Sequence, residues 1–106
     1  MKPYFVEFYA SSPVGLRAQA VEAVDGAVHR GATLLVLGLD SLSILDDAAI
    51  SAMIVALRRL REIGGTVRLV TQSATHHKRL IATGLDRIFE VVVNAEEARS
   101  AETIGV

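Results

Sequence analysis

Short apolar runs alternate along the chain with longer segments in which apolar residues recur at helical spacing. The short runs are rich in aliphatic, β-branched or aromatic residues, which is typical of strands; they occupy residues 4–9, 33–39, 66–70 and 88–93. The longer segments carry apolar positions every three or four residues, which predicts helices. They cover residues 13–31, 47–63 and 75–83, and a last short helix is expected after Asn94.

This alternation predicts the fold class. Strands that alternate with helices of this length are typical of an α/β domain whose strands pair mostly in parallel, joined by right-handed crossovers. The run TLLVLGL at residues 33–39 is apolar throughout, which is typical of a strand with both faces buried. We therefore expect one α/β domain over residues 1–106, with a mixed, mostly parallel sheet of about four strands and about four helices.

Two adjacent carboxylates stand where the second predicted helix begins. Asp46 and Asp47 follow the loop after residues 33–39. Asp46 is suited to be the N-cap, because its side chain can accept a hydrogen bond from a backbone N–H two or three residues later. Asp47 then takes the first helical position, where the helix dipole favours a negative charge. The helix is expected to stop at Gly64 and Gly65, a common C-cap signal.

The second predicted helix has an apolar core face and an opposite face of small residues. On a helical wheel the core face gathers the large apolar side chains, which are Ile50, Met53, Ile54, Leu57 and Leu60. The opposite face, expected toward solvent, carries Ala48, Ala52, Val55, Arg59 and Glu62. Small exposed residues would let a partner protein approach closely, whereas alanines are also good helix formers with no further role. The pattern leaves both interpretations open.

Composition argues against several classes of function. The chain has 11 Lys and Arg against 12 Asp and Glu, a formal charge of −1, and only 5% aromatic residues. This balance argues against a nucleic-acid binder, which needs a basic field or aromatic stacking platforms. There is no cysteine, the N-terminus does not read as a secretory signal, and no apolar run approaches the roughly 20 residues of a membrane span. We expect a cytoplasmic protein that binds no nucleic acid and spans no membrane.

Asp40, Asp46 and Asp47 together are a candidate Mg²⁺ and phosphoacceptor site of the kind found in response-regulator receivers. A receiver carries its phosphoacceptor Asp at a strand end, as Asp40 stands here, beside further acidic ligands. It also needs an acidic pair after the first strand, where this chain has Tyr-Ala-Ser-Ser at residues 9–12, and a lysine after a later strand, which is missing from the expected place. A receiver-like phosphoacceptor domain is therefore the third interpretation.

The run His76-His77-Lys78-Arg79 is the other candidate site. Adjacent histidines on a helix point about 100° apart, so they do not chelate one metal ion as an i, i+4 pair does. No Cys, Asp or Glu stands at ligand spacing beside them, and we expect a solvated basic helix start. The chain also lacks a phosphate-binding glycine loop and a nucleophile elbow. No metal, cofactor or catalytic chemistry is therefore expected.

Two stretches of the chain resemble the STAS domain family, and within it the anti-sigma factor antagonists. They are LLVLGLDSLSILDDAAISAMIVALRRLREIGGTVRLV at residues 34–70 and RLIATGLDRIFEVVVNAEEA at residues 79–98. The resemblance covers residues 33–98; the first thirty residues fit loosely, with an N-terminal strand reduced or missing. It implies a STAS-like fold and a regulatory protein whose partner is an anti-sigma factor, an ATPase that acts as a serine kinase.

The phosphoacceptor position of the family is altered in this chain. In antagonists of this type the loop before the second helix reads Asp-Ser-Ser-Gly or Asp-Ser-Thr-Gly, and the partner kinase phosphorylates the first Ser. The resemblance places Asp46, Asp47, Ala48 and Ala49 on these positions. Asp47 carries one negative charge, against roughly 1.5–2 for a phosphate. We hypothesise that Asp47 imitates the phosphorylated state in part, so that the chain either escapes ordinary kinase binding or has a partner adapted to the charge.

The expected function is that of a regulatory protein-binding module without enzymatic activity. Its expected interface joins the loop before the second helix to an exposed strip of that helix: Asp40, Ser41, Ser43, Asp46, Asp47, Ala48, Ser51, Ala52, Val55 and Arg59. Ser41 and Ser43 could be modified in place of position 47, or could only satisfy hydrogen bonds of the loop. The alternative function is an accessory subunit of a lipid-transport ABC system, which would brace the ATPase through the same surface.

Overall fold

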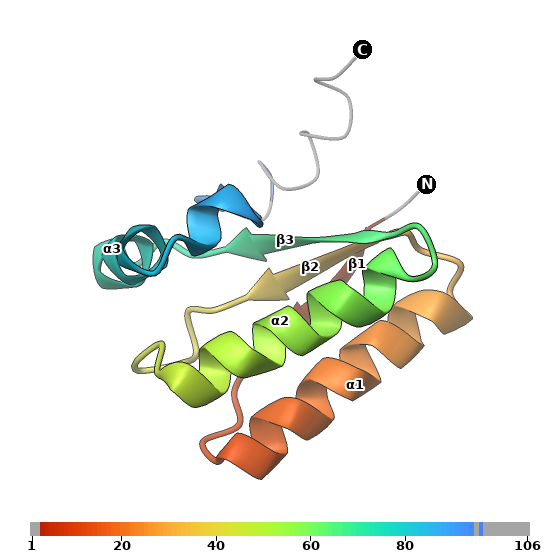
Figure 1. Cartoon of the computed structure of the whole chain (residues 1–106), viewed down its shortest axis with the longest axis horizontal. Coiled ribbons are helices and arrows are strands. Elements are labelled where there is room, and N and C mark those ends of the chain that lie inside the picture. The colour runs from red at the N-terminus through yellow and green to blue at the C-terminus, as the bar shows by residue number, and fades with distance from the viewer. Residues whose placement is uncertain (1–2, 95, 97–106) are drawn as a thin grey trace.

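A computed structural model describes residues 3–94 and 96 (Figure 1). Its elements follow in the order β1 (Tyr4–Glu7), α1 (Pro13–His29), β2 (Leu34–Gly38), α2 (Asp47–Arg61), β3 (Thr66–Val70), α3 (Ala74–Ala82), the short 3₁₀ helix η1 (Leu85–Arg87) and β4 (Glu90–Val92). The four predicted strands and the first three predicted helices are all present, whereas η1 was not predicted. The last helix, expected after Asn94, lies outside the described residues apart from Glu96.

The four strands form one sheet in the order β1-β2-β3-β4, and each neighbouring pair is parallel. Leu35 of β2, for example, stands opposite Tyr4 of β1 and Val67 of β3. The predicted α/β class with mostly parallel pairing is confirmed, and the part of the sheet that the structure describes contains no antiparallel pair. Because all four strands run the same way, the loops that follow them meet at one edge of the sheet, where α/β proteins place their binding sites.

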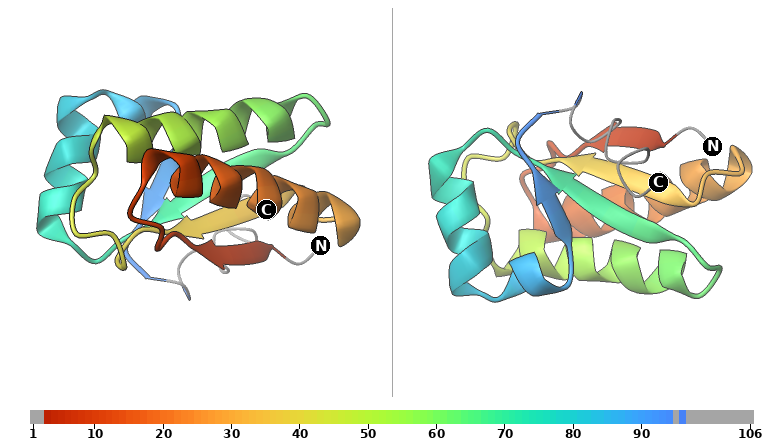
Figure 2. Two further views of the ribbon diagram at one scale, coloured as in Figure 1. Left: turned by 90° about the horizontal axis from the view of Figure 1, so that it is seen from below. Right: turned by 90° about the horizontal axis from the view of Figure 1, so that it is seen from above.

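The helices α1 and α2 lie side by side against one face of the sheet, and α3 lies at the edge toward which the strands point (Figure 1, Figure 2). The side chains of β2 alternate between the two faces. Leu35 and Leu37 belong to the main core together with the helices, whereas Leu34 and Val36 belong to a smaller cluster with Val70 and Val92. Both faces of β2 are therefore buried, as its continuous apolar run predicts.

The buried face of α2 differs from the one predicted by the helical wheel. Each of its buried residues has another buried residue three or four positions away: Ala49, Ala52, Met53, Ala56, Leu57 and Leu60. Ile50 and Ile54, expected in the core face, are only half-buried. Ala52, expected on the solvent face, is 2% exposed. The prediction that Ala52 belongs to an exposed strip is therefore wrong.

The neighbouring helix is the reason for this difference. Small and aliphatic residues of α1 are buried on the side that packs into the same core, namely Leu16, Ala20, Ala23, Val24 and Ala27. Helix axes can approach closely only where such residues meet, because side chains fill the space between them at crystal-like density. The helical-wheel prediction assumes that α2 packs only against the sheet. In the structure α1 also packs against the side of α2 that carries the alanines. Most alanines of α2 therefore serve helix packing.

Replacing Ala56 with Leu tests this packing. Ala56 is fully buried, so the larger side chain must displace its neighbours and should lower the free energy of unfolding by about 1–3 kcal/mol. Ser51→Leu, on the exposed side of the same helix, is the matched control and should change it by no more than about 0.5 kcal/mol. Urea unfolding followed by circular dichroism measures both variants; equal stabilities would contradict the close packing of α1 and α2.

Candidate functional site

The loop between β2 and α2, residues 39–46, lies at the edge where the strands end, and other elements hold it in place. At its start, the Asp40 carboxylate accepts a hydrogen bond from Thr71 Oγ1 at 2.6 Å and from the Gln72 N–H at 3.1 Å. Thr71 is fully buried, and its hydroxyl oxygen accepts from the Ser73 N–H at 3.1 Å. Asp40 therefore fastens the end of β2 to the segment that leaves β3.

These contacts also set the ionisation of Asp40. Partial desolvation alone would raise the pKa of this carboxyl, but hydrogen bonds from Thr71 and from the Gln72 and Ser73 N–H groups outweigh it, with a contribution from nearby His76. The net effect is a pKa below the ordinary value of an aspartate. Asp40 is thus held as a charged acceptor whose oxygens are already engaged within the fold.

A second carboxylate reaches the same loop from β1. Glu7, which interrupts the apolar run of the first strand, accepts a hydrogen bond from the Ser41 N–H through Oε2 at 3.0 Å. To do so its side chain crosses Gly38 of β2, where a Cβ atom would collide with the Glu7 carboxylate. Gly38 therefore provides the space through which Glu7 satisfies a backbone group of the loop.

Two side chains of α3 hold the middle and the end of the loop. Nε2 of His76 donates to the Leu42 carbonyl at 2.8 Å, and Nε of Arg79 donates to the Leu45 carbonyl at 2.8 Å. His76 is only 4% exposed, so the prediction of a solvated basic helix start is wrong at this residue. Carbonyls in a loop have no strand or helix partner of their own, and α3 supplies the missing donors.

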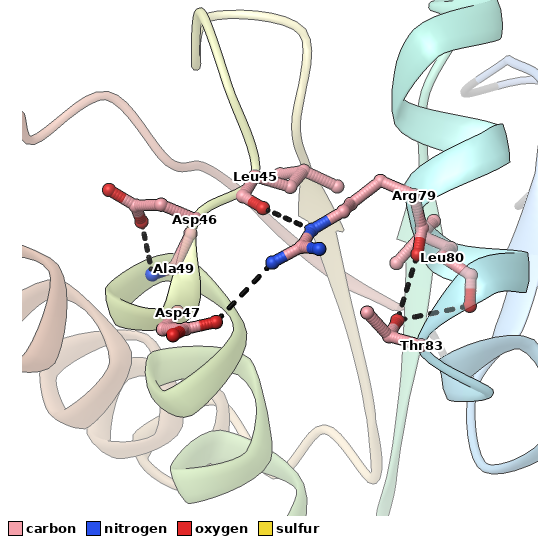
Figure 3. Close-up of polar contacts among 7 residues, drawn as sticks. All are labelled: Leu45, Asp46, Asp47, Ala49, Arg79, Leu80 and Thr83. Atoms are coloured by element: carbon pink, nitrogen blue, oxygen red, sulfur yellow. Dashed lines mark hydrogen bonds and ion pairs between the residues drawn. The ribbon is translucent and has the colours of Figure 1, made fainter.

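The two acids at the start of α2 occupy the positions predicted for them. Oδ1 of Asp46 accepts from the Ala49 N–H at 3.0 Å, which is an N-cap contact, and Asp47 is the first residue of the helix. Oδ1 of Asp47 lies 3.3 Å from Nη2 of Arg79. The guanidinium of Arg79 therefore bridges the Leu45 carbonyl and the Asp47 carboxylate (Figure 3).

Two of the hollows near the start of α2 contain Asp47 or residues of the predicted strip. One, of about 370 Å³, lies between the loop and α3 and is lined by Ser43, Ile44, Leu45, Asp46, Asp47, Thr75, His76 and Arg79. The other, of about 240 Å³, lies between α1 and α2 and is lined by Pro13, Arg17, Ala48, Ser51, Ala52 and Val55. We call the second hollow the α1–α2 groove. It contains four residues of the predicted strip, with the buried Ala52 at its base, whereas Arg59 is exposed elsewhere on α2.

The acids of the receiver-like interpretation serve separate structural contacts. Asp40 accepts from Thr71 and Gln72, Asp46 caps α2, and Asp47 pairs with Arg79. Among residues 3–94 and 96, no group of three or more His, Cys, Asp or Glu is placed to hold a metal ion. The geometry therefore gives no support to a receiver-like Mg²⁺ site. Of the described helices, none has the length and apolar character needed to cross a bilayer.

Sequence analysis missed several residues that shape this site. Glu7 comes from β1, Thr71 from the segment after β3, and His76 and Arg79 from α3, so they reach the loop only in the folded chain. Glu7 did leave a signal, since it is the charged residue that interrupts the apolar run of residues 4–9. For Arg79 the sequence holds no comparable signal, because a basic residue on a short helix is usually solvated.

Replacing Asp40 with Asn tests its role as a charged acceptor. A carboxyl whose pKa is lowered by folding stabilises the protein above its ordinary pKa of about 3.9, and this contribution is lost as the pH falls through the folded-state pKa. Asp40→Asn should therefore be less stable than wild type at pH 7, and the difference should shrink below about pH 4. Urea unfolding over a pH series measures this; a difference that stays constant in acid would contradict the assigned role.

Comparison with known proteins places this geometry in a family. Residues 16–98 match the STAS domain. A search of curated proteins found no match. The NMR structure of the protein TM1081 superimposes with a TM-score of 0.76 at 18% identity, covering 91% of this chain and 78% of that one. A crystal structure of TM1081 from Thermotoga maritima, there named a candidate anti-sigma factor antagonist, gives 0.71 at 18% identity, with 97% and 83% covered.

SpoIIAA, named an anti-sigma factor antagonist, has the same fold. Its unphosphorylated form superimposes with a TM-score of 0.74 at 16% identity, covering 99% of this chain and 90% of that one. At these identities the superpositions show that the fold is shared, and they agree with the match in sequence. Because that match spans residues 16–98, well over half of its length, the chain belongs to the STAS domain family.

Proposed function

We propose that this chain is a regulatory protein-binding module of the anti-sigma factor antagonist type, and that its partner is an anti-sigma factor of the serine-kinase-like ATPase class. The observation that carries the proposal is the surface at the start of α2. There a loop fixed by Glu7, Asp40, His76 and Arg79 ends beside the α1–α2 groove. A surface that is ordered before contact loses little conformational entropy on binding.

The exposed parts of this surface would form the contact. Ser43 and Ile44 are exposed on the loop, Ile44 to 62%, and Ser51 is exposed at the rim of the groove. The groove is large enough for an aliphatic side chain. Arg17 lies at its edge and forms no ion pair with any described residue, so a partner that offers an aliphatic side chain next to a carboxylate would fit.

The residue at position 47 decides whether the module can be switched by phosphorylation. A carboxylate has no hydroxyl to accept a phosphoryl group, so the switch expected from the family cannot operate at Asp47. The proposed module acts by binding alone, without catalysis. Ser43 is an exposed loop hydroxyl that lines the same hollow as Asp47.

The missing hydroxyl also favours a second candidate function. An accessory subunit of a lipid-transport ABC system would need a permanent contact with an ATPase and no phosphorylation switch. It would use the same start of α2. The two functions differ in the partner, which makes the identity of the bound protein the decisive observation.

A pull-down from lysate of the source organism, read by mass spectrometry, tests the proposal. Wild type and Asp47→Ser are used as parallel baits. We expect a kinase-like ATPase with both, and ATP-dependent phosphorylation at position 47 only in Asp47→Ser, because only that variant carries the hydroxyl. Recovery of permease and transporter ATPase components would favour the ABC function. If neither class of protein binds either bait, the proposal fails.

A charge in the α1–α2 groove should weaken binding of the recovered partner. Val55 is half-buried and lines the groove, so Val55→Glu would place an unpaired carboxylate in the contact, and we expect at least about tenfold weaker binding. Val28→Glu is the matched control, because Val28 is 49% exposed near the end of α1. Biolayer interferometry measures both; equal loss in the two variants would show that the groove is not the contact.

A further inference from the structure

We propose that Arg79 neutralises Asp47 within the chain, so that this altered site has the electrostatic character of an unphosphorylated antagonist. The inference rests on the proposed function and concerns the regulation of the same site. The sequence alone supports the hypothesis that Asp47 imitates the phosphorylated state in part. The geometry points instead to a site that stays competent to bind, because its extra charge is cancelled before a partner arrives.

The guanidinium of Arg79 is fixed from two sides. Its Nε donates to the Leu45 carbonyl at 2.8 Å, and its Nη2 lies 3.3 Å from Oδ1 of Asp47 (Figure 3). The end of α3 is fixed as well, since the Thr83 hydroxyl donates to the Arg79 carbonyl at 2.9 Å. The hydrogen bond to the Leu45 carbonyl therefore directs the Arg79 side chain toward the start of α2 independently of Asp47.

The charges around the hollow support this interpretation. Its ionisable lining residues are Asp46, Asp47, His76 and Arg79. Arg79 lies opposite Asp47, so the charges of these two side chains cancel, and the carboxylate of Asp46 keeps its own negative charge, as it would beside a serine. A phosphate at position 47 would add roughly 1.5–2 negative charges, and a single guanidinium would leave much of that uncancelled.

An exposed ion pair is normally weak, because two long side chains must be ordered in water to form it. Asp47 is indeed fully exposed and Arg79 is 41% exposed. Here, however, the hydrogen bond to Leu45 orders the guanidinium already, and Asp47 has a short side chain at a helix start. The pair matters for the local potential that a partner meets, and its contribution to stability need not be large.

The local potential can be measured without any partner. Solvent paramagnetic relaxation enhancement with a cationic and an anionic nitroxide reports the potential at each amide proton. At the amides of residues 47–49, Arg79→Gln should raise the ratio of the enhancement by the cationic nitroxide to that by the anionic one by about twofold or more. The reason is that the Asp47 carboxylate is then uncancelled and, from less than a Debye length away, attracts the cationic nitroxide. The double variant Asp47→Ser, Arg79→Gln should return to the wild-type ratio.

Matched variants make this result decisive. Lys78→Gln removes the same charge from the neighbouring exposed position of α3, and it should change the ratio at residues 47–49 much less than Arg79→Gln does. Equal effects would show that only net charge is being measured, and no effect of Arg79→Gln would show that Arg79 does not cover Asp47. Either result would overturn the proposal, whatever the partner of the chain proves to be.

Binding to the ATPase recovered in the pull-down tests the regulatory consequence. Arg79→Gln should weaken binding at least about tenfold, because it exposes the charge of Asp47. The double variant should restore binding to within about threefold of wild type, since the exposed charge is then absent. A loss in the double variant as large as that in Arg79→Gln would mean that Arg79 contacts the partner or supports the loop, and would contradict neutralisation as its role.

Discussion

The hydrogen bonding of one loop is the constraint on which this site depends. Most backbone groups of a loop that leaves the end of a strand have no partner in a ladder or helix, so side chains of other elements must satisfy them if the loop is to keep one shape. Here Glu7 accepts from the Ser41 N–H, while His76 and Arg79 donate to the Leu42 and Leu45 carbonyls. These side chains come from β1 and α3, so the shape of the loop is a property of the whole sheet edge.

The helix that follows the loop links this edge to the core. Its alanines let α1 lie close beside it, and the same closeness leaves a groove where the two helices begin. Packing and the proposed contact therefore share residues: Ala52 is buried against the core and also lines the groove. Residues such as Ala48 and Val55 are half-buried, which is suited to a surface that a partner completes.

The fold could be predicted from the sequence far better than the site. Strand β2 and the N-cap of α2 follow from local chemistry, namely a continuous apolar run and an Asp before a helical stripe. The burial of Ala52 and His76 could not be predicted in this way, because it is decided by which element lies alongside. The role of Arg79 is likewise set by the Asp47 carboxylate and the Leu45 carbonyl, 32 and 34 residues away, and no local pattern encodes such contacts.

The claim that Arg79 is held in place beside Asp47 is tested most directly by the motion of its Nε–H group. Nitrogen-15 relaxation of this group gives an order parameter, and a side chain fixed to the Leu45 carbonyl should have a value near that of rigid backbone, about 0.85. It should stay high in Asp47→Asn, because the Leu45 contact remains. A value below about 0.6 in wild type, typical of a freely moving group, would contradict the account, since an unfixed guanidinium could not keep Asp47 neutralised.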